Sequence, residues 1–239
     1  MHVRLLSSAA DLAAWRRIQP DRPLHFVPTM GALHQGHRSL LLRAAQPRGT
    51  APSPRVLLSV FVNPLQFGPG EDFERYPRDR AADVALAEAA GVDALFVPDL
   101  ATIYPGGEAA LTRVLAPPEL AELLCGRSRP GHFDGVATVV CRLLALVKPD
   151  RLFLGEKDWQ QLLILRRVVA DLGLPLQVEG CGTVREPDGL ACSSRLRYLS
   201  AEERCRASVV TESLSQAATK HQSGDQDASG LIAGVRDEL

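Results

Sequence analysis

The stretch Pro28-Thr-Met-Gly-Ala-Leu-His-Gln-Gly-His37 decides the fold of this chain. It follows the apolar run Leu24–Val27, which suits a buried strand, and it leads into residues 37–45, whose pattern predicts a helix. A strand that passes through a glycine-containing turn into a helix is the opening of a unit in which parallel strands alternate with helices. The sequence therefore predicts an α/β arrangement around this stretch.

The same alternation continues along the chain. Further apolar runs predict strands at 55–62, 94–97 and 151–154, with another beginning at 176. Helical patterns are found at 9–18, 80–90, 133–147 and 159–172, and the stretch 101–129 is less regular. We therefore expect a Rossmann-like parallel sheet with helices on both faces.

A small second lobe is expected at the C-terminal end. The sequence Glu186-Pro-Asp-Gly189 predicts a turn, residues 201–219 have a helical pattern, and residues 222–229 are polar and typical of a loop. We place the two domains at 1–178 and 179–239, the second as an α+β lobe that ends in the helix-like segment 231–239.

Composition and charge exclude several function classes. The 239 residues are 46% apolar and carry a net charge of −1, so no basic excess favours binding to nucleic acid. No apolar run is long enough to span a membrane. The five cysteines form no CxxC pair, and the first residues lack the pattern of a secretory signal. We expect a cytoplasmic protein with no nucleic-acid or membrane partner.

Polar clusters directly follow the expected strands at 24–27, 55–62 and 151–154. Ligands of parallel sheets bind at the carboxyl ends of strands, and a helix N-terminus attracts phosphate. His34 and His37 lie at such a helix start, and Gly31 and Gly36 let the backbone approach a ligand closely. Two solvated surface histidines are the competing interpretation, but the H-x-G-H spacing after a strand favours a phosphate site.

The string PTMGALHQGH at 28–37 resembles the signature of the HxGH nucleotidylyltransferase superfamily and, within it, the pantothenate synthetase (pantoate–β-alanine ligase) family. Four further segments agree with that family in the same order. They are Phe61–Gly68 with Glu71, Asp72 and 76–78; Arg129–Phe133 with Gly135 and Val136; Gly155–Asp158 with Gln160 and Gln161; and Asp188–Ala191 with 193–195 and 198–200.

The resemblance implies ATP-dependent joining of pantoate and β-alanine to pantothenate through a pantoyl adenylate, with release of AMP and pyrophosphate. It implies a nucleotide- and pantoate-binding first domain and a Ser193-Ser194-Arg195 loop that grips phosphate from the second. The implied catalytic residues are His37, His34 and Lys157. The implied ATP contacts are Met30, Gly31, Ala32, Leu33, His34, Gln35, Gly36, His37, Gly155, Glu156, Lys157, Asp158, Val184, Cys192, Ser193, Ser194 and Arg195.

Pantoate needs polar contacts that do not over-stabilise its nucleophilic carboxylate. Neutral amides meet this need, so we expect Gln66 and Gln161 to bind pantoate. Gln66 is also expected to bind β-alanine. Asp158 is expected to hold Mg²⁺ or to cap the following helix. Met30 and Phe61 either cover the dimethyl carbon of pantoate or belong to the core. Further pocket residues are expected at Asn63, Tyr76, Arg129 and His132.

Three other functions compete with this interpretation. They are nucleotidyl transfer to a phosphate monoester, a catalytically inactive nucleotide-binding regulator, and a metallohydrolase that uses His34, His37 and His132. The chain also departs from the family pattern at Trp159, Cys192 and Leu196. Compared with the family, which is usually a homodimer, the C-terminal lobe looks shortened, as expected of a truncated member, a fragment of a fusion, or part of a longer natural product.

Overall fold

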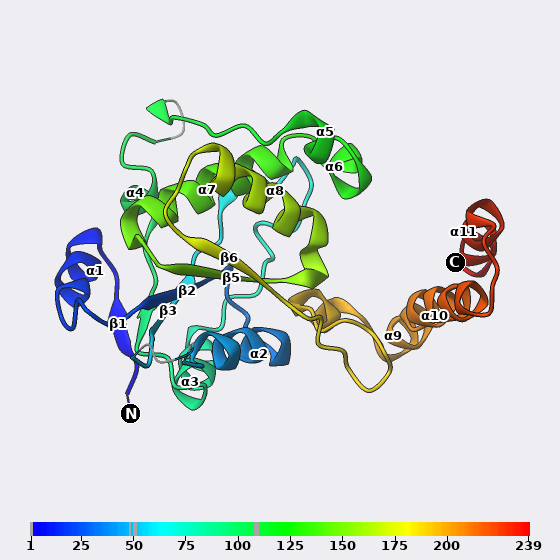
Figure 1. Cartoon of the computed structure of the whole chain (residues 1–239), viewed down its shortest axis with the longest axis horizontal. Coiled ribbons are helices and arrows are strands. Elements are labelled where there is room, and N and C mark those ends of the chain that lie inside the picture. The colour runs from blue at the N-terminus through cyan, green and yellow to red at the C-terminus, as the bar shows by residue number, and fades with distance from the viewer. Residues whose placement is uncertain (1, 48, 50–51, 108–109) are drawn as a thin grey trace. The chain divides into compact units, whose positions relative to one another are not determined.

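The computed structural model describes residues 2–47, 49, 52–107 and 110–239. Within them, six parallel strands form one sheet in the order β1-β4-β3-β2-β5-β6 (Figure 1). The strands are β1 (Arg4–Leu6), β2 (Leu24–Thr29), β3 (Arg55–Val60), β4 (Ala94–Phe96), β5 (Arg151–Gly155) and β6 (Gln177–Cys181). The expected α/β fold with a parallel sheet is confirmed.

The central strands are apolar throughout because both faces of the sheet are covered. Phe26 and Leu57 pack into one core, whereas their neighbours Val27 and Leu58 pack into the other, and all four are fully buried. Burial of such side chains contributes about 1.5–3 kcal/mol each. This two-sided burial explains why these strands are continuous apolar runs in the sequence rather than alternating ones.

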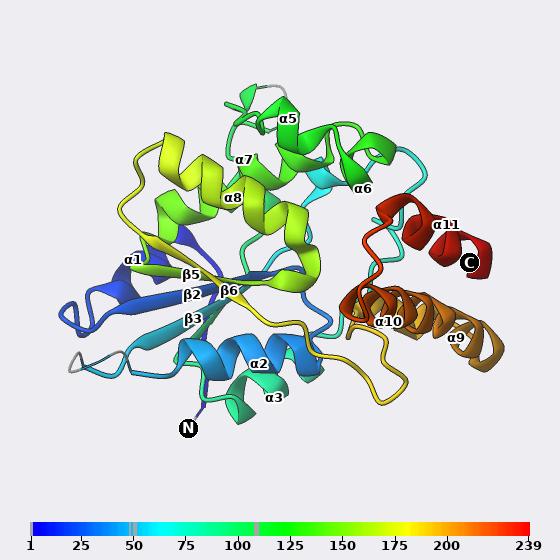
Figure 2. The same ribbon diagram turned by 45° about the vertical axis from the view of Figure 1, so that its right-hand side comes forward.

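Helices form a layer on each face of the sheet (Figures 1 and 2). One face is covered by α1 (Ala9–Arg16), α7 (His132–Val147) and α8 (Trp159–Asp171). The other is covered by α2 (Gln35–Ala44) and α3 (Arg80–Ala89). Short helices lie in the connections: η1 (Pro64–Gln66), α4 (Leu100–Ile103), α5 (Pro118–Ala121), α6 (Leu124–Ser128) and η3 (Glu156–Asp158).

The strand order places a topological switch point between β2 and β5. From β2 the chain moves outward through β3 to β4, and it then returns to the other side of β2 to form β5 and β6. The segments that leave β2 and β5 consequently diverge to opposite faces of the sheet. A crevice at the carboxyl ends of these two strands is where open α/β sheets bind their ligands.

Strand β1 is the one strand of the described sheet that the sequence did not predict. It has three residues, lies at the sheet edge beside β4, and buries Leu6 while Leu5 remains 49% exposed. So short an edge strand has no periodicity of its own to detect. Helix α2 also begins at Gln35, two residues before the predicted start.

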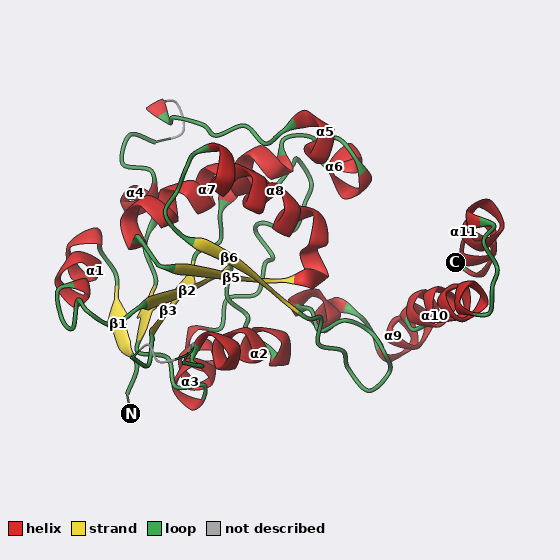
Figure 3. Ribbon diagram, in the orientation of Figure 1, coloured by secondary structure: helices red, strands yellow, loops and turns green. Residues whose placement is uncertain are grey.

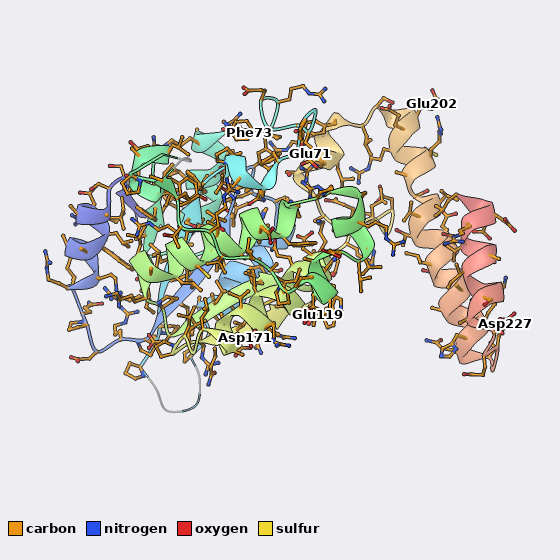
Figure 4. All side chains as sticks on the ribbon, turned by 90° about the horizontal axis from the view of Figure 1, so that it is seen from above. Glu71, Phe73, Glu119, Asp171, Glu202 and Asp227 are labelled. Atoms are coloured by element: carbon orange, nitrogen blue, oxygen red, sulfur yellow. The ribbon has the colours of Figure 1, made fainter. Side chains whose placement is uncertain are left out.

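The chain folds into two compact units, Met1–Gly182 and Thr183–Leu239. Within the second unit, one antiparallel bridge between Arg185 and Ala191 supplies the β component, and the rest consists of helices and the loops between them (Figure 3). Its helices are η4 (Ser194–Tyr198), α9 (Ala201–Ala207), α10 (Val209–Gln222) and α11 (Ala228–Glu238). Figure 4 marks Glu202 on α9 and Asp227 at the start of α11.

The prediction of one continuous helix at 201–219 is wrong, because the segment is helical but forms two helices that meet at Ser208. The Ser208 hydroxyl donates to the Cys205 carbonyl at 2.8 Å, which competes with the helical hydrogen bonds at this point. The predicted loop at 222–229 is shorter in the structure, where α11 already begins at Ala228. No helix of the described residues has the length and apolar character needed to cross a bilayer.

Candidate active site

The turn between β2 and α2 is built from left-handed backbone conformations. Gly31 has φ +84° and Ala32 has φ +51°, and a Cβ atom on Gly31 would lie 2.9 Å from both the Asp83 carboxylate and Val60. A glycine is therefore required at position 31 for its conformation and for space. Met30 is half-buried, whereas Gly31, Ala32 and Leu33 are buried. Their contact with ATP stays a prediction.

His34 and His37 cap the start of α2 with their side chains. His34 is the N-cap residue, and its Nδ1 accepts the Gly36 N–H at 3.1 Å. Nδ1 of His37 accepts the His34 N–H at 3.3 Å, and the two ring centroids are 4.1 Å apart. Because Nδ1 of each ring accepts a backbone N–H, we assign the ring proton of each neutral imidazole to Nε2. Each ring thus offers an N–H donor on the side away from the helix start.

The pKa of His37 is lowered from 6.5 to about 3. Burial is the largest cause, and the nearby groups His34 and Lys157 lower it further. His37 is therefore a neutral hydrogen-bond donor at physiological pH and not a source of a proton. The effect of Lys157 also shows that the residues following β5 lie close to those following β2, as the switch point requires.

Lys157 and Asp158 form a pair directly after β5. Lys157 Nζ lies 3.1 Å from Asp158 Oδ1, and the two side chains are 37% and 59% exposed. Asp158 occupies the N-cap position of α8, but its side chain makes no capping hydrogen bond. Gly155 ends β5, and Glu156 is exposed in η3. Lys157 is thus a partly exposed cation at the ligand edge of the sheet.

Gln66 lies in η1 with its side-chain amide facing Met30. Its Nε2 donates to Met30 Sδ at 3.2 Å, while its Oε1 accepts from Asn63 Nδ2 at 3.1 Å. Asn63 is itself oriented by backbone groups, because Nδ2 also donates to the Gly135 carbonyl and Oδ1 accepts the Leu65 N–H. This chain of hydrogen bonds determines the orientation of the Gln66 amide, with Nε2 toward Met30 and Oε1 toward Asn63.

Tyr104 completes this chain of hydrogen bonds. Its hydroxyl donates to Asn63 Oδ1 at 2.8 Å, and its ring packs edge-on against Phe61 at 6.1 Å. Phe61 is 8% exposed and belongs to the apolar core. Phe61 is therefore a core residue, and its contact with the dimethyl carbon of pantoate stays a prediction. The sequence did not indicate Tyr104 as a candidate, because no short-range pattern relates it to Asn63, which lies 41 residues earlier.

Arg129 and His132 hold the backbone of Gln66. Arg129 binds Glu71 through two hydrogen bonds of 2.8 and 2.6 Å, and Figure 4 shows Glu71 and Phe73 on the same loop. His132 Nδ1 donates to the Gln66 carbonyl at 2.8 Å, and its Nε2 accepts from Arg129 at 3.1 Å. Burial, with a further contribution from Arg129, lowers the pKa of His132, so this ring is neutral.

The other candidate residues differ in how neighbouring groups hold them. Hydrogen bonds from Arg129 lower the pKa of Glu71, which keeps the ion pair intact near neutral pH. Tyr76 is buried and packs against Phe67. Gln161 is half-buried in the first turn of α8, and no hydrogen bond to its amide is found among the described residues. Trp159 beside it is 49% exposed.

The candidates of the second unit gather on a hairpin and the 3-10 helix after it. The Cys192 N–H donates to the Val184 carbonyl at 2.9 Å across the hairpin, and its thiol donates to Glu186. Ser193 Oγ accepts the Arg195 N–H at 3.3 Å, and Ser194 is 7% exposed. The structure thus brings together Val184, Cys192, Ser193, Ser194 and Arg195 within this unit.

No group of three or more His, Cys, Asp or Glu side chains among the described residues is arranged to hold a metal ion. A cage made by the protein alone is therefore not formed there. The exposed Asp158 carboxylate fits a different mode, in which Mg²⁺ keeps several waters and is held by one carboxylate together with the phosphates of a nucleotide.

A family model described as pantoate-beta-alanine ligase matches residues 4–238. The chain belongs to the pantoate-beta-alanine ligase family. It is 52% identical to a pantothenate synthetase of Magnetococcus marinus over 98% of this chain and 79% of that protein. It is 53% identical to a bifunctional pantoate ligase/cytidylate kinase of Synechococcus sp. over 97% of this chain and 44% of that protein. The chain thus spans about half the length of the bifunctional relatives that it matches.

Solved structures of the pantoate-beta-alanine ligase family show the same fold. A pantothenate synthetase from Thermus thermophilus has a TM-score of 0.91 and 48% identity, covering 99% of this chain and 82% of that one. A pantoate-beta-alanine ligase from Francisella tularensis, complexed with beta-gamma ATP and beta-alanine, has a TM-score of 0.83 and 34% identity over 99% of this chain and 86% of that one. The family resemblance inferred from the motifs is confirmed.

Proposed function

We propose that this chain catalyses the ATP-dependent condensation of pantoate with β-alanine to pantothenate, through a pantoyl-adenylate intermediate. The observation that carries the proposal is the pair of neutral imidazoles at the start of α2, directly after the carboxyl end of β2. The family model covers the whole of this sheet. The relative complexed with beta-gamma ATP and beta-alanine supports ATP and β-alanine as substrates. We further propose a cytoplasmic homodimer.

In the first step, a pantoate carboxylate oxygen attacks the α-phosphorus, and the bond from phosphorus to the pyrophosphate oxygen breaks. The carboxylate is ionised at neutral pH, so no general base is required. Catalysis then depends on stabilising negative charge on the phosphoryl oxygens. His34 and His37 serve this step as Nε2–H donors, and Lys157 adds a positive charge.

In the second step, the neutral amine of β-alanine attacks the acyl carbon of the adenylate and forms the amide bond. AMP leaves with the electrons of the carbon–oxygen bond, and the amine nitrogen releases one proton to solvent. Gln66 and Gln161 bind pantoate in this proposal, and Gln66 also contacts β-alanine. The hydrogen bond from Asn63 to Gln66 Oε1 turns the Gln66 N–H groups toward Met30, which follows β2. Gln66 therefore presents a donor to the substrate.

We assign the nucleotide and pantoate sites to residues 1–178 and the phosphate-gripping loop, with Ser193, Ser194 and Arg195, to residues 179–239. The proposed ATP contacts are those inferred from the family motifs, from Met30–His37, Gly155–Asp158, Val184 and Cys192–Arg195. Asp158 would hold Mg²⁺, which neutralises phosphate charge when bound.

The decisive experiment measures AMP release with pantoate, β-alanine, ATP and Mg²⁺, omitting each in turn. AMP is expected in the presence of all four, and pyrophosphate exchange is expected with pantoate but without β-alanine. Exchange that instead requires a phosphate monoester would overturn the proposal. ATP binding without any turnover would indicate a nucleotide-binding regulator.

A further inference from the structure

Asp83 is a buried carboxylate that binds the turn before α2. It lies on α3, 50 residues after the turn, and is 3% exposed. Its Oδ2 accepts the Ala32 N–H at 3.2 Å, and its Oδ1 accepts the Leu33 N–H at 2.7 Å. A buried carboxylate is unfavourable unless hydrogen bonds compensate its desolvation. The two N–H groups of the turn provide such hydrogen bonds to Asp83.

The turn needs such support because its backbone is strained. Left-handed φ values at a non-glycine residue cost of order 1–3 kcal/mol, and Ala32 has φ +51°. The remaining N–H of the turn, that of Gly31, donates to Thr29 Oγ1 at 3.2 Å. Three successive N–H groups thus bind side-chain oxygens, two of which belong to Asp83.

The Leu33 N–H is the last backbone donor before His34. The position of His34 is therefore set on one side by Asp83 and on the other by α2, whose Leu40 and Leu41 are anchored in the core. His34 in turn holds His37 through its own N–H. A shift of the turn displaces both rings together.

We propose that Asp83 is a positioning residue that aligns the Nε2–H donors of His34 and His37 for the reacting phosphate. Its kinetic consequences rest on the proposed ligase activity. Asp83 touches no substrate in this proposal and acts through the backbone of Ala32 and Leu33.

The test replaces Asp83 with asparagine, which has the same shape but only one acceptor oxygen. One N–H of the turn then faces an NH₂ group, and the turn must move. A displacement of about 1 Å at a reacting group can reduce the rate by about 10²-fold, so kcat for pantoate-dependent pyrophosphate exchange is expected to fall by that order. The KM for pantoate is expected to stay close to that of the unmodified chain.

Asp79→Ala is the matched control. Asp79 caps the same helix by accepting the Ala82 N–H, it is exposed, and no hydrogen bond between its carboxylate and the turn is found among the described residues. Its loss lowers the stability of α3 by about 1 kcal/mol, and kcat should not change. Asp83→Glu, which keeps both oxygens and the charge, should retain more activity than Asp83→Asn. If Asp83→Asn does not fold, Asp83→Glu is tested instead for the smaller loss of kcat that its longer side chain causes by displacing the turn.

A second measurement does not depend on catalysis. Proton–nitrogen NMR of the imidazoles should show His34 and His37 as Nε2–H tautomers, with mixed tautomers in Asp83→Asn. Unchanged tautomers together with an unchanged kcat in the variant would overturn the proposal. A chain without any pantoate-dependent exchange would overturn the ligase function instead, and the tautomer measurement would still decide the role of Asp83.

Discussion

Nδ1 of His37 accepts the backbone N–H of His34 at 3.3 Å, so the second histidine of the motif caps the helix that the first one begins. Each ring has two tasks, one for each nitrogen. Nδ1 satisfies a backbone donor at the helix start, and Nε2–H is the donor that the proposed reaction uses. The two tasks can be separated by substitution.

His37→Asn and His37→Gln are expected to separate them. The asparagine side chain can place an oxygen near the position of Nδ1, whereas glutamine can place an NH₂ group near that of Nε2. We expect His37→Asn to keep the thermal stability while pantoate-dependent exchange falls by about 10²–10³-fold, the usual cost of a lost donor. His37→Gln should retain more exchange activity and lose more stability. Equal kinetics of the two variants would contradict the separation.

Acid should destabilise the fold through His37. The pKa of this group is about 3 in the folded chain and near 6.5 when unfolded, so the unfolded chain binds more protons between these values. This contribution to the free energy of unfolding is present above pH 6.5 and is lost as the pH falls toward 3. Urea unfolding across this interval should show a shallower pH dependence in His37→Asn. His221→Asn, which changes an exposed histidine of the second unit, is the matched control.

Tyr104→Phe tests the orientation of Gln66. The variant removes the donor to Asn63 Oδ1 but leaves the Leu65 N–H in place, so Asn63 loosens without being released. We expect a KM for pantoate raised several-fold, less than in Gln66→Ala, with the KM for ATP unchanged in both. Steady-state kinetics with each substrate varied will check this. A parallel rise in both KM values would show that Gln66 serves another site.

Gly135→Ala should disrupt the support of η1. A Cβ atom at this position would lie 2.2 Å from the Leu65 carbonyl oxygen and 2.8 Å from the Gln66 nitrogen. Since both are backbone atoms, relief requires α7 to move, and we expect a loss of about 1–3 kcal/mol in the free energy of unfolding. Gly182→Ala, where nothing lies within 4 Å of the new atom, is the control. Denaturant unfolding of both variants will compare them.

Local pattern sufficed for the alternating elements and for the motif at the start of α2. Apolar runs bounded by proline and glycine predicted β2–β6, because a strand covered on both faces has few polar residues. The histidine spacing indicated a phosphate site for a related reason, since a helix start leaves N–H groups unpaired whatever surrounds it. These properties depend on residues within one or two turns of each other.

The tertiary structure decided which distant groups support that site. The carboxylate of Asp83 and the hydroxyl of Tyr104 reach the turn and Asn63 across 50 and 41 residues, and no local pattern marks either one. The neutrality of His37 likewise arises from burial and from Lys157 on the far side of the switch point. The sequence by itself determined the fold and the place of the candidate site, because these follow from short-range pattern. Only packing decided the protonation and orientation of its groups, because desolvation and hydrogen bonding depend on what the fold brings near.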